Sequence, residues 1–175
     1  MRVIGIAGWS GAGKTTLLMK LIPRLGQRGL RVSTIKHAHH AFDLDHPGKD
    51  SHTHRLAGAS EVLVSSATRW ALIHELREAP ELPLGALLTK LSPVDIVLVE
   101  GFKHENHPKL EVYRAILGKP LLHPEDPSIV ALAADQPMAG LKLPVAMLDD
   151  IDRITDIVAK HAAPLDSVVA RLRKA

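Results

Sequence analysis

A phosphate-loop spacing near the amino terminus constrains the fold of this chain more than any other feature. Directly after the apolar run 3–7, the pattern G-x-x-x-x-G-K-[ST] is filled by Gly8-Trp9-Ser10-Gly11-Ala12-Gly13-Lys14-Thr15. Glycines permit a tight turn with no Cβ to keep an anion away, and the unpaired N–H groups that open a helix favour negative charge. A chance match in a Gly-rich turn is the alternative. A strand before the loop and a helix after it favour a nucleoside triphosphate site.

The loop residues have separate predicted roles. Lys14 is expected to reach the β- and γ-phosphates, and the hydroxyl of Thr15 is expected to ligate Mg²⁺. We predict that the nucleotide is bound by Gly8, Ser10, Gly11, Ala12, Gly13, Lys14, Thr15 and Thr16.

Composition limits the chain to a few classes of protein. Its 175 residues suit one domain, which we place at residues 1–175, and a hydrophobic content of 46% is sufficient for a buried core. No apolar run approaches the roughly 20 residues of a transmembrane helix, and the run before the loop is too short for a signal peptide. The sequence has no cysteine, which favours a reducing cytoplasm. A net charge of +3 and five aromatic side chains suit an anionic ligand better than a nucleic acid.

Strand and helix patterns alternate along the chain. We expect strands at 2–7, 30–36, 61–65, 70–76, 94–99, 110–116, 128–134 and 145–148. Helices are expected at 14–28, 50–57, 84–91, 152–160 and from about 165 onward. This alternation behind a phosphate loop predicts an α/β fold of the P-loop NTPase type, with a doubly wound, mostly parallel sheet and helices on both faces. Ligands then bind at the carboxyl ends of the strands.

The most β-like strand offers two carboxylates for magnesium. Asp95 opens this strand and Glu100 closes it, so the two residues are about 16 Å apart. Only the carboxyl end faces the nucleotide, which selects Glu100 as a magnesium ligand or as the group that polarises an attacking water. The alternative is that Glu100 begins a solvated loop. We predict Lys14 and Glu100 as the catalytic residues.

The segment after the second predicted strand is rich in His and Asp. Lys36 and His37 lie where a phosphate or another anionic group would arrive, and Asp50 is a candidate magnesium ligand. A solvated loop, with Asp50 only as a helix cap, is an equally supported alternative. Six histidines fall within eighteen residues, and their scatter favours surface positions over a metal store: His37, His39, His40, His46, His52 and His54.

Asp135 is the candidate residue for selecting the base. The guanine-reading Asn-Lys-x-Asp pattern is absent, but Asp135 follows a late predicted strand whose end would lie over the base. A carboxylate there accepts hydrogen bonds from guanine N1–H and N2–H₂, which adenine does not supply. A loop aspartate before Pro137 is the alternative.

Four blocks of sequence in order resemble the molybdopterin-guanine dinucleotide biosynthesis adapter proteins, the MobB family. The resemblance covers roughly residues 3 to 135. Its blocks are Gly8 to Thr16, Ile35-Lys36-His37-Ala38-His39-His40, Asp45-His46-Pro47-Gly48-Lys49-Asp50-Ser51 continuing through Arg55 and Ala57-Gly58-Ala59, and Val99-Glu100-Gly101-Phe102-Lys103.

This resemblance implies a GTP-binding protein of the molybdenum cofactor pathway. It would work beside the guanylyltransferase that joins GMP to molybdopterin, as a homodimer of the dimerising branch of P-loop GTPases and with weak hydrolysis of its own. By this similarity Thr15 and Glu100 form the magnesium site, and the Lys36 to Asp50 region is the mobile loop. Trp9 departs from the dimerising ATPases of this branch, which often have a lysine at that position.

Three functions therefore compete. The favoured one is a GTP-binding adapter for a partner transferase. A His-rich metallochaperone GTPase is weakened by the lack of cysteine, and a small-molecule kinase is weakened because Arg69 and Arg77 are too few to clamp two phosphoryl groups. We expect slow hydrolysis, since the sequence shows no arginine finger and no water-orienting glutamine, which matter by about 10³–10⁵ in rate.

Overall fold

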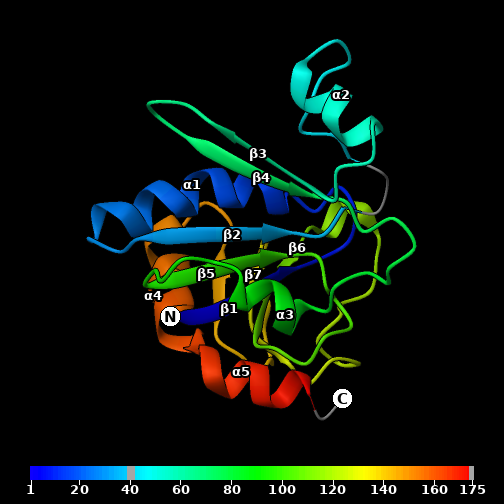
Figure 1. Ribbon diagram of the computed structural model, residues 1–175. Coiled ribbons are helices and arrows are strands. Elements are labelled where there is room, and N and C mark those ends of the chain that lie inside the picture. The colour runs from blue at the N-terminus through cyan, green and yellow to red at the C-terminus, as the bar shows by residue number, and fades with distance from the viewer. Residues whose placement is uncertain (39–41, 174–175) are drawn as a thin grey trace. The chain divides into compact units, whose positions relative to one another are not determined.

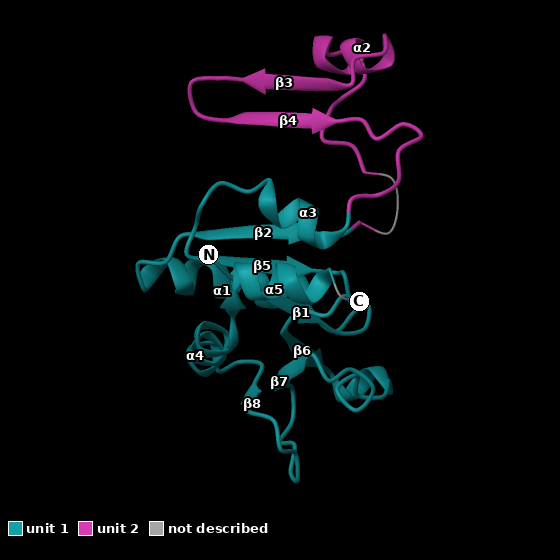
Figure 2. Cartoon of the chain, turned by 60° about the horizontal axis from the view of Figure 1, so that its bottom comes forward, with its two compact units in different colours: residues 1–37, 83–175 teal, residues 38–82 magenta. Residues whose placement is uncertain are grey.

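The computed structural model describes residues 1–38 and 42–173 of the chain. Contacts between residues divide it into two compact units, shown in teal and magenta in Figure 2. Unit 1 comprises residues 1–37 and 83–175, and unit 2 comprises residues 38–82. The assignment of residues 1–175 to one domain stays a prediction.

Unit 1 contains a seven-stranded sheet, and this confirms the predicted mostly parallel architecture. Six parallel strands run in the order β2-β5-β1-β6-β7-β8. Their bounds are Arg2–Ala7 (β1), Val32–Lys36 (β2), Ile96–Glu100 (β5), Lys109–Tyr113 (β6), Ile129–Ala134 (β7) and Val145–Met147 (β8). A short strand, β9 (Ala163–Pro164), pairs antiparallel with the start of β1. The continuous burial of β5 follows from its central position between β2 and β1.

Helices cover both faces of this sheet, as predicted (Figure 1). On one face, α1 (Lys14–Gln27) and α4 (Ile151–His161) pack against Ile4 and Ile6 of β1. On the other face, α3 (Leu84–Thr89) and α5 (Leu165–Leu172) pack against Val3 of the same strand. Alternate residues of a strand point to opposite faces, which is why neighbouring residues of β1 belong to two separate cores.

Unit 2 contains one short helix and a hairpin. The helix α2 spans Asp50–Leu56, and the strands β3 (Glu61–Ser65) and β4 (Trp70–His74) form an antiparallel two-stranded sheet of their own. The guanidinium of Arg55 connects three carboxylates of this unit, because it donates to Asp43, Asp45 and Glu75. Hydrogen bonds and this positive charge hold the pKa of Asp43 below its ordinary value.

Several predicted boundaries are corrected by the structure. The strand predicted at 110–116 ends at Tyr113, because a 3₁₀ helix begins at Ala115. Lys49 is the N-cap residue of α2, so the prediction that Asp50 caps this helix is wrong, and Asp50 is its first residue. The strand predicted at 70–76 ends at His74. Within the described residues, no helix is long and apolar enough to cross a membrane.

Candidate nucleotide-binding site

Two glycines fix the path of the predicted phosphate loop. Gly8 follows β1 with φ of 145°, and a Cβ there would lie 2.5 Å from the carbonyl oxygen of Val112. Gly13, with φ of 97°, is the N-cap residue of α1. Both positions require backbone angles that other residues rarely adopt. The helix begins at Lys14, so its first N–H groups have no partner within the helix and face the loop with positive polarity.

Lys14, Thr15, Lys36 and Glu100 converge beside this loop. The Thr15 hydroxyl donates to Oε1 of Glu100 at 3.3 Å, and Nζ of Lys36 lies 3.9 Å from Oε2 of the same carboxylate. The Lys14 ammonium donates to the carbonyl oxygens of Gly8 and Trp9 at 2.9 and 3.0 Å. Burial lowers the pKa of Lys14, the charge of Glu100 opposes this, and Lys36 adds to the lowering.

The parallel register explains why these residues meet. In the sheet, Glu100 lies opposite Lys36 on β2 and opposite Ile6 on β1, so three strand ends coincide at one edge. The Glu100 side chain is only 14% exposed, whereas that of Lys36 is 64% exposed. The carboxylate is therefore fixed beside the loop, and the exposed ion pair itself contributes little to stability.

A tight turn after Glu100 contacts His37. Gly101 has φ of 94° and Phe102 has φ of 48°. The backbone N–H of His37 donates to the carbonyl of Glu100 at 2.8 Å, and the His37 ring stacks on Phe102 with centroids 4.6 Å apart. The sequence predicts His37 at a strand end, whereas its packing against this turn comes from the tertiary structure.

Sequence reasoning missed Arg114. Its Nε donates to the carbonyl of Ala12 at 3.1 Å, and the guanidinium lies against Gly13, whose Cβ would meet Nε at 3.3 Å. Because the strand was predicted to continue to 116, Arg114 was assigned to a strand interior instead of a strand end. Its neighbour Ala115 donates its N–H to Oδ1 of Asp135 at 3.0 Å. Asp135 directly follows β7 and fixes the segment that carries Arg114, and its predicted contact with the base stays a prediction.

The remaining predicted residues fall in different places. Ser10, Gly11 and Thr16 belong to the loop and the first turn of α1 and are exposed. Asp50 belongs to unit 2, whereas Lys14, Thr15, Lys36 and Glu100 belong to unit 1. His39 and His40 lie outside the described residues. In the described part of the chain, no group of three or more His, Asp or Glu side chains is arranged to hold a metal ion.

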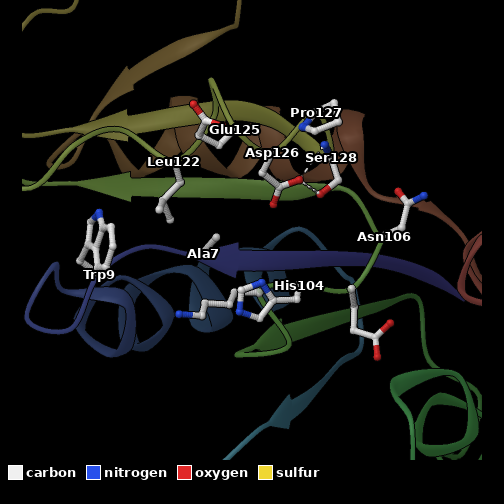
Figure 3. A pocket seen from close by; sticks show the side chains of 11 residues that line it. Ala7, Trp9, His104, Asn106, Leu122, Glu125, Asp126, Pro127 and Ser128 are labelled. Carbon is white, nitrogen blue, oxygen red and sulfur yellow. Dashed lines mark hydrogen bonds between the residues drawn. The ribbon is translucent and has the colours of Figure 1, made fainter. Parts of the chain in front are cut away.

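A cavity of about 460 Å³ lies beside the loop residue Trp9 (Figure 3). Its lining residues come from the end of β1, the loop and two later loops: Ala7, Trp9, Lys103, His104, Glu105, Asn106, Leu122, Glu125, Asp126, Pro127 and Ser128. Figure 3 shows Trp9 at one end and Asn106 at the other. The indole N–H of Trp9 donates to the carbonyl of Pro120 at 2.8 Å, which holds the ring in place. The predicted phosphate-binding residues do not line this cavity.

A buried charge pair supports the wall of this cavity. The Lys109 side chain is 2% exposed, and its ammonium lies 3.0 Å from Oδ2 of Asp126 and donates to Ser128 and to the carbonyl of Glu105. His107 is fully buried beside it, in space that Gly5 leaves by having no side chain. Burial, with a smaller contribution from Lys109, lowers the pKa of His107 to about 4.

The fold and this loop define the class of the protein. A parallel sheet with helices on both faces, a glycine-rich loop between β1 and α1, and a carboxylate at the end of a neighbouring strand are the features of a P-loop nucleotide-binding fold. Comparison with known proteins gives the family. Residues 3–135 match the family described as "Molybdopterin guanine dinucleotide synthesis protein B", MobB, and the chain belongs to this family.

Individual relatives agree with this assignment. The chain is 45% identical over 166 residues to the molybdopterin-guanine dinucleotide biosynthesis adapter protein of Escherichia coli K12, covering 90% of this chain and 91% of that one. It is 44% identical over 156 residues to the adapter protein of Haemophilus influenzae, covering 89% and 84%. A crystal structure of molybdopterin-guanine biosynthesis protein B is similar with a TM-score of 0.70 and 26% identity, over 90% of this chain and 98% of that chain. A MobB homolog from Bacillus stearothermophilus has a TM-score of 0.64 at 28% identity, over 91% and 97%.

Proposed function

We propose that this protein is a GTP-binding adapter in molybdopterin guanine dinucleotide biosynthesis that assists the guanylyltransferase of that pathway. One observation carries the nucleotide part of the proposal, namely the approach of the Thr15 hydroxyl to the Glu100 carboxylate beside the phosphate loop. Membership of the MobB family and the names of the relatives support the pathway.

The donor atoms at this point suit Mg²⁺. The hydroxyl of Thr15 and the carboxylate of Glu100 are hard oxygen donors 3.3 Å apart, which is the ligand type that Mg²⁺ prefers together with phosphate oxygens and water. When bound, the metal ion would neutralise charge on the β- and γ-phosphates. Lys14 would exchange its two loop carbonyls for phosphate oxygens. Lys36 would balance the charge of Glu100. The role of Asp50 as a magnesium ligand stays a prediction from the sequence.

Hydrolysis by the isolated protein is expected to be slow. We propose Lys14 and Glu100 as the groups that act on the transferred phosphoryl group. Arg114 lies against Gly13, the residue that precedes α1. The sequence shows no water-orienting glutamine, so a partner would have to complete the site before hydrolysis becomes fast.

Binding and turnover measurements test this proposal. The purified protein is titrated with GTP, ATP and inosine triphosphate in Mg²⁺, and hydrolysis of GTP is followed in the same buffer. We expect GTP to bind at least about tenfold more tightly than ATP, since adenine offers no N1–H and no N2–H₂ to Asp135. Equal affinity for ATP would overturn the guanine assignment, and a turnover of tens per second would favour a free-standing enzyme instead of an adapter.

The partner transferase supplies a separate test of the adapter role. Formation of molybdopterin guanine dinucleotide by purified guanylyltransferase is measured with and without this protein, and with the Lys14→Ala variant. We expect stimulation that requires both the wild-type loop and GTP. No effect at any ratio of the two proteins would contradict the adapter function.

Molybdopterin itself is the second ligand that we propose. The cavity in Figure 3 has the volume of a typical small-molecule site, and the Lys103 ammonium and the His104 ring on its wall are the groups that we propose for the phosphate of the cofactor. The Lys103→Ala variant is expected to bind molybdopterin several-fold more weakly than wild type and to retain GTP binding. Unchanged affinity would remove this cavity as the cofactor site.

A second copy of this chain is proposed as a further partner. The hairpin of unit 2 forms a sheet of two strands, and Leu63 and Trp70 on it are 60% and 66% exposed. Two-stranded hairpins are marginally stable alone, and an exposed edge with apolar side chains is suited to an isologous contact. Sedimentation should show a wild-type dimer, and the double variant Leu63→Ser/Trp70→Ser should be a monomer. Met19, which is 73% exposed on α1, provides the control Met19→Ser, which should remain dimeric.

The cytoplasm is the compartment that we propose, on the ground that the sequence has no cysteine.

A further inference from the structure

Trp9 belongs to the phosphate loop, but the proposed nucleotide contacts make no use of its side chain. Its indole lines the cavity of about 460 Å³ beside the loop (Figure 3). The ring is held at two points, because its N–H donates to the carbonyl of Pro120 at 2.8 Å and the Lys119 ammonium lies 5.7 Å from its centroid. A ring that is already fixed loses little conformational freedom when a ligand stacks on it. The phosphate loop therefore supplies an aromatic surface to this cavity.

The cavity lies where β6 directs polar side chains toward loops. Leu110 and Val112 of β6 belong to the core beneath α1 and α4, so the alternate residues Lys109 and Glu111 point to the opposite face of the sheet. Both polar side chains are buried. Buried polar groups need hydrogen-bond partners, and on this face the partners come from the loops that line the cavity or adjoin it.

The carboxylate of Glu111 fixes one wall of the cavity. Its two oxygens accept the backbone N–H groups of Leu122 and His123 at 2.7 and 3.0 Å. Leu122 itself lines the cavity, and its carbonyl accepts from the N–H groups of Glu125 and Asp126 in the turn that follows. The wall is therefore formed before a ligand arrives, as is usual for small-molecule sites.

The acidic side chains of the lining indicate what kind of ring would fit. Glu105, Glu125 and Asp126 give the lining three carboxylates. Hydrogen bonds from Ser128 to Oδ1 fix Asp126, and its Oδ2 accepts one hydrogen bond, from Lys109 (Figure 3). An ionised carboxylate accepts hydrogen bonds at about four sites and donates none. This lining therefore selects a ring whose edge carries N–H groups.

We infer that Trp9 is the binding residue for the heterocyclic ring of the ligand in this cavity, with its indole stacked on a flat ring whose N–H edge faces the lining carboxylates. Lys103 and His104 are left for the phosphate. This inference rests on the proposed function and deepens it, because it states which residue holds the pterin ring of molybdopterin. Guanine carries the same amino and N–H edge as a pterin, so the test has to distinguish the two rings.

Two matched probes without phosphate isolate the contact with the ring. The probes are 6,7-dimethylpterin and 6,7-dimethyllumazine, which differ only in having an amino group or a carbonyl at C2. Their affinities are measured by calorimetry and by quenching of tryptophan fluorescence, with and without saturating GTP and Mg²⁺. We expect wild type to bind the pterin about tenfold more tightly than the lumazine, since a carbonyl at C2 meets carboxylates without a hydrogen bond. Saturating GTP should change the affinity for the pterin by no more than about threefold.

Variants of Trp9 test the stacking directly. Trp9→Leu should bind the pterin about tenfold or more weakly, and Trp9→Phe should recover part of the loss. Quenching should disappear in Trp9→Phe, whose remaining tryptophan is Trp70. Both variants should bind GTP within about threefold of wild type, because Lys14 uses the backbone carbonyl of Trp9, and this retained binding shows that they are folded. Phe42→Leu, which removes an exposed aromatic ring in unit 2, is the control and should bind the pterin as wild type does.

The outcomes separate this inference from the function on which it rests. If wild type binds neither molybdopterin nor the probes, the cavity fails as the cofactor site and the inference fails with it, while GTP binding is decided by its own titration. If molybdopterin binds but Trp9→Leu keeps the wild-type affinity for the pterin, the role of Trp9 is overturned and the cofactor site stands. If GTP displaces the pterin, the ring held by Trp9 is guanine and the inference is wrong. Equal affinities for the two probes would overturn the assignment of the N–H edge.

Discussion

A Cβ atom on Gly101 would lie 2.5 Å from the Cβ of His37, so these two residues share space that only glycine leaves. The backbone N–H of His37 also donates to the carbonyl of Glu100, and the Glu100 carboxylate accepts from the Thr15 hydroxyl. Space released by one glycine thus fixes the end of β5 at which the magnesium site is proposed.

Replacing Gly101 should damage nucleotide binding more than stability. In Gly101→Ala, a left-handed backbone and the clash with His37 would shift Glu100, and we expect at least about a tenfold loss of affinity for GTP in Mg²⁺, together with about 1–2 kcal/mol of stability. Gly29→Ala is the matched control. Gly29 also has a positive φ, of 79°, but a Cβ added there would meet no other atom within 4 Å. The control should lose similar stability and keep its affinity. Equal affinities would show that the turn does not position Glu100.

Removing the charge of Glu100 should abolish the dependence of binding on magnesium. We expect Glu100→Gln to bind GTP equally in Mg²⁺ and in EDTA, because an amide is a poorer ligand for a hard cation than a carboxylate. Asp95→Asn serves as the control on the other end of the same strand, where Asp95 accepts from the N–H of Arg31. Isothermal titration calorimetry measures the affinity for GTP in the two buffers. Tighter binding in Mg²⁺ than in EDTA by Glu100→Gln would contradict the assignment of Glu100 as a magnesium ligand.

The pair of the buried Lys109 and the partly exposed Asp126 should matter more to stability than a fully exposed pair. Lys109→Met leaves Asp126 and Ser128 without their cation, and we expect a loss of about 3–5 kcal/mol. Arg24 pairs with Asp152 at the surface, and Arg24→Met should cost less than about 1 kcal/mol. Urea denaturation measures both variants. Similar losses would mean that the Lys109 cluster is solvated in solution.

Acidification should destabilise the protein through His107. The pKa of this ring is lowered to about 4 in the folded state, so between pH 6.5 and pH 4 the unfolded chain binds the proton more readily. The stabilising contribution of neutral His107 is complete above pH 6.5 and falls as the pH falls through this window. The loss amounts to about 2 kcal/mol by pH 5.

The variant His107→Leu isolates this effect. Its free energy of unfolding should change by about 2 kcal/mol less than that of wild type between pH 7.5 and pH 5. His161→Gln is the control, since burial and Lys160 also lower the pKa of His161 but its ring is less enclosed. Parallel pH profiles for wild type and His107→Leu would show that His107 is not the group responsible.

The order of strands and helices was largely predictable because hydrophobic periodicity and glycines are local signals. The phosphate loop was predictable from the spacing of residues between Gly8 and Thr15, and β5 was predictable from its continuous run of apolar residues. Glu100 could be chosen over Asp95 by one rule about parallel sheets. The strand that ends at Tyr113 was predicted three residues too long, since Arg114 and Ala115 give no local signal for its end. That error concealed Arg114.

Contacts between distant segments were not predictable in the same way. Arg114 meets Ala12 across 102 positions of sequence, and Thr15 meets Glu100 across 85. The burial of Lys109 was not predictable either, because it depends on hydrogen bonds to Asp126 and Ser128 that only the folded chain brings together. The sequence also gave no sign that β3 and β4 form a separate sheet, since each strand has an ordinary pattern.

By itself, the sequence determined the phosphate loop, the alternation of strand and helix, the carboxylate at the end of β5 and the resemblance to the MobB family, because each depends on residues close together in the chain. Tertiary structure alone decided which side chains share a site. Parallel pairing in register brings Lys36 and Glu100 to one edge, and the end of β6 places Arg114 against Gly13. Such juxtapositions depend on how strands are ordered in the sheet, which no local pattern encodes.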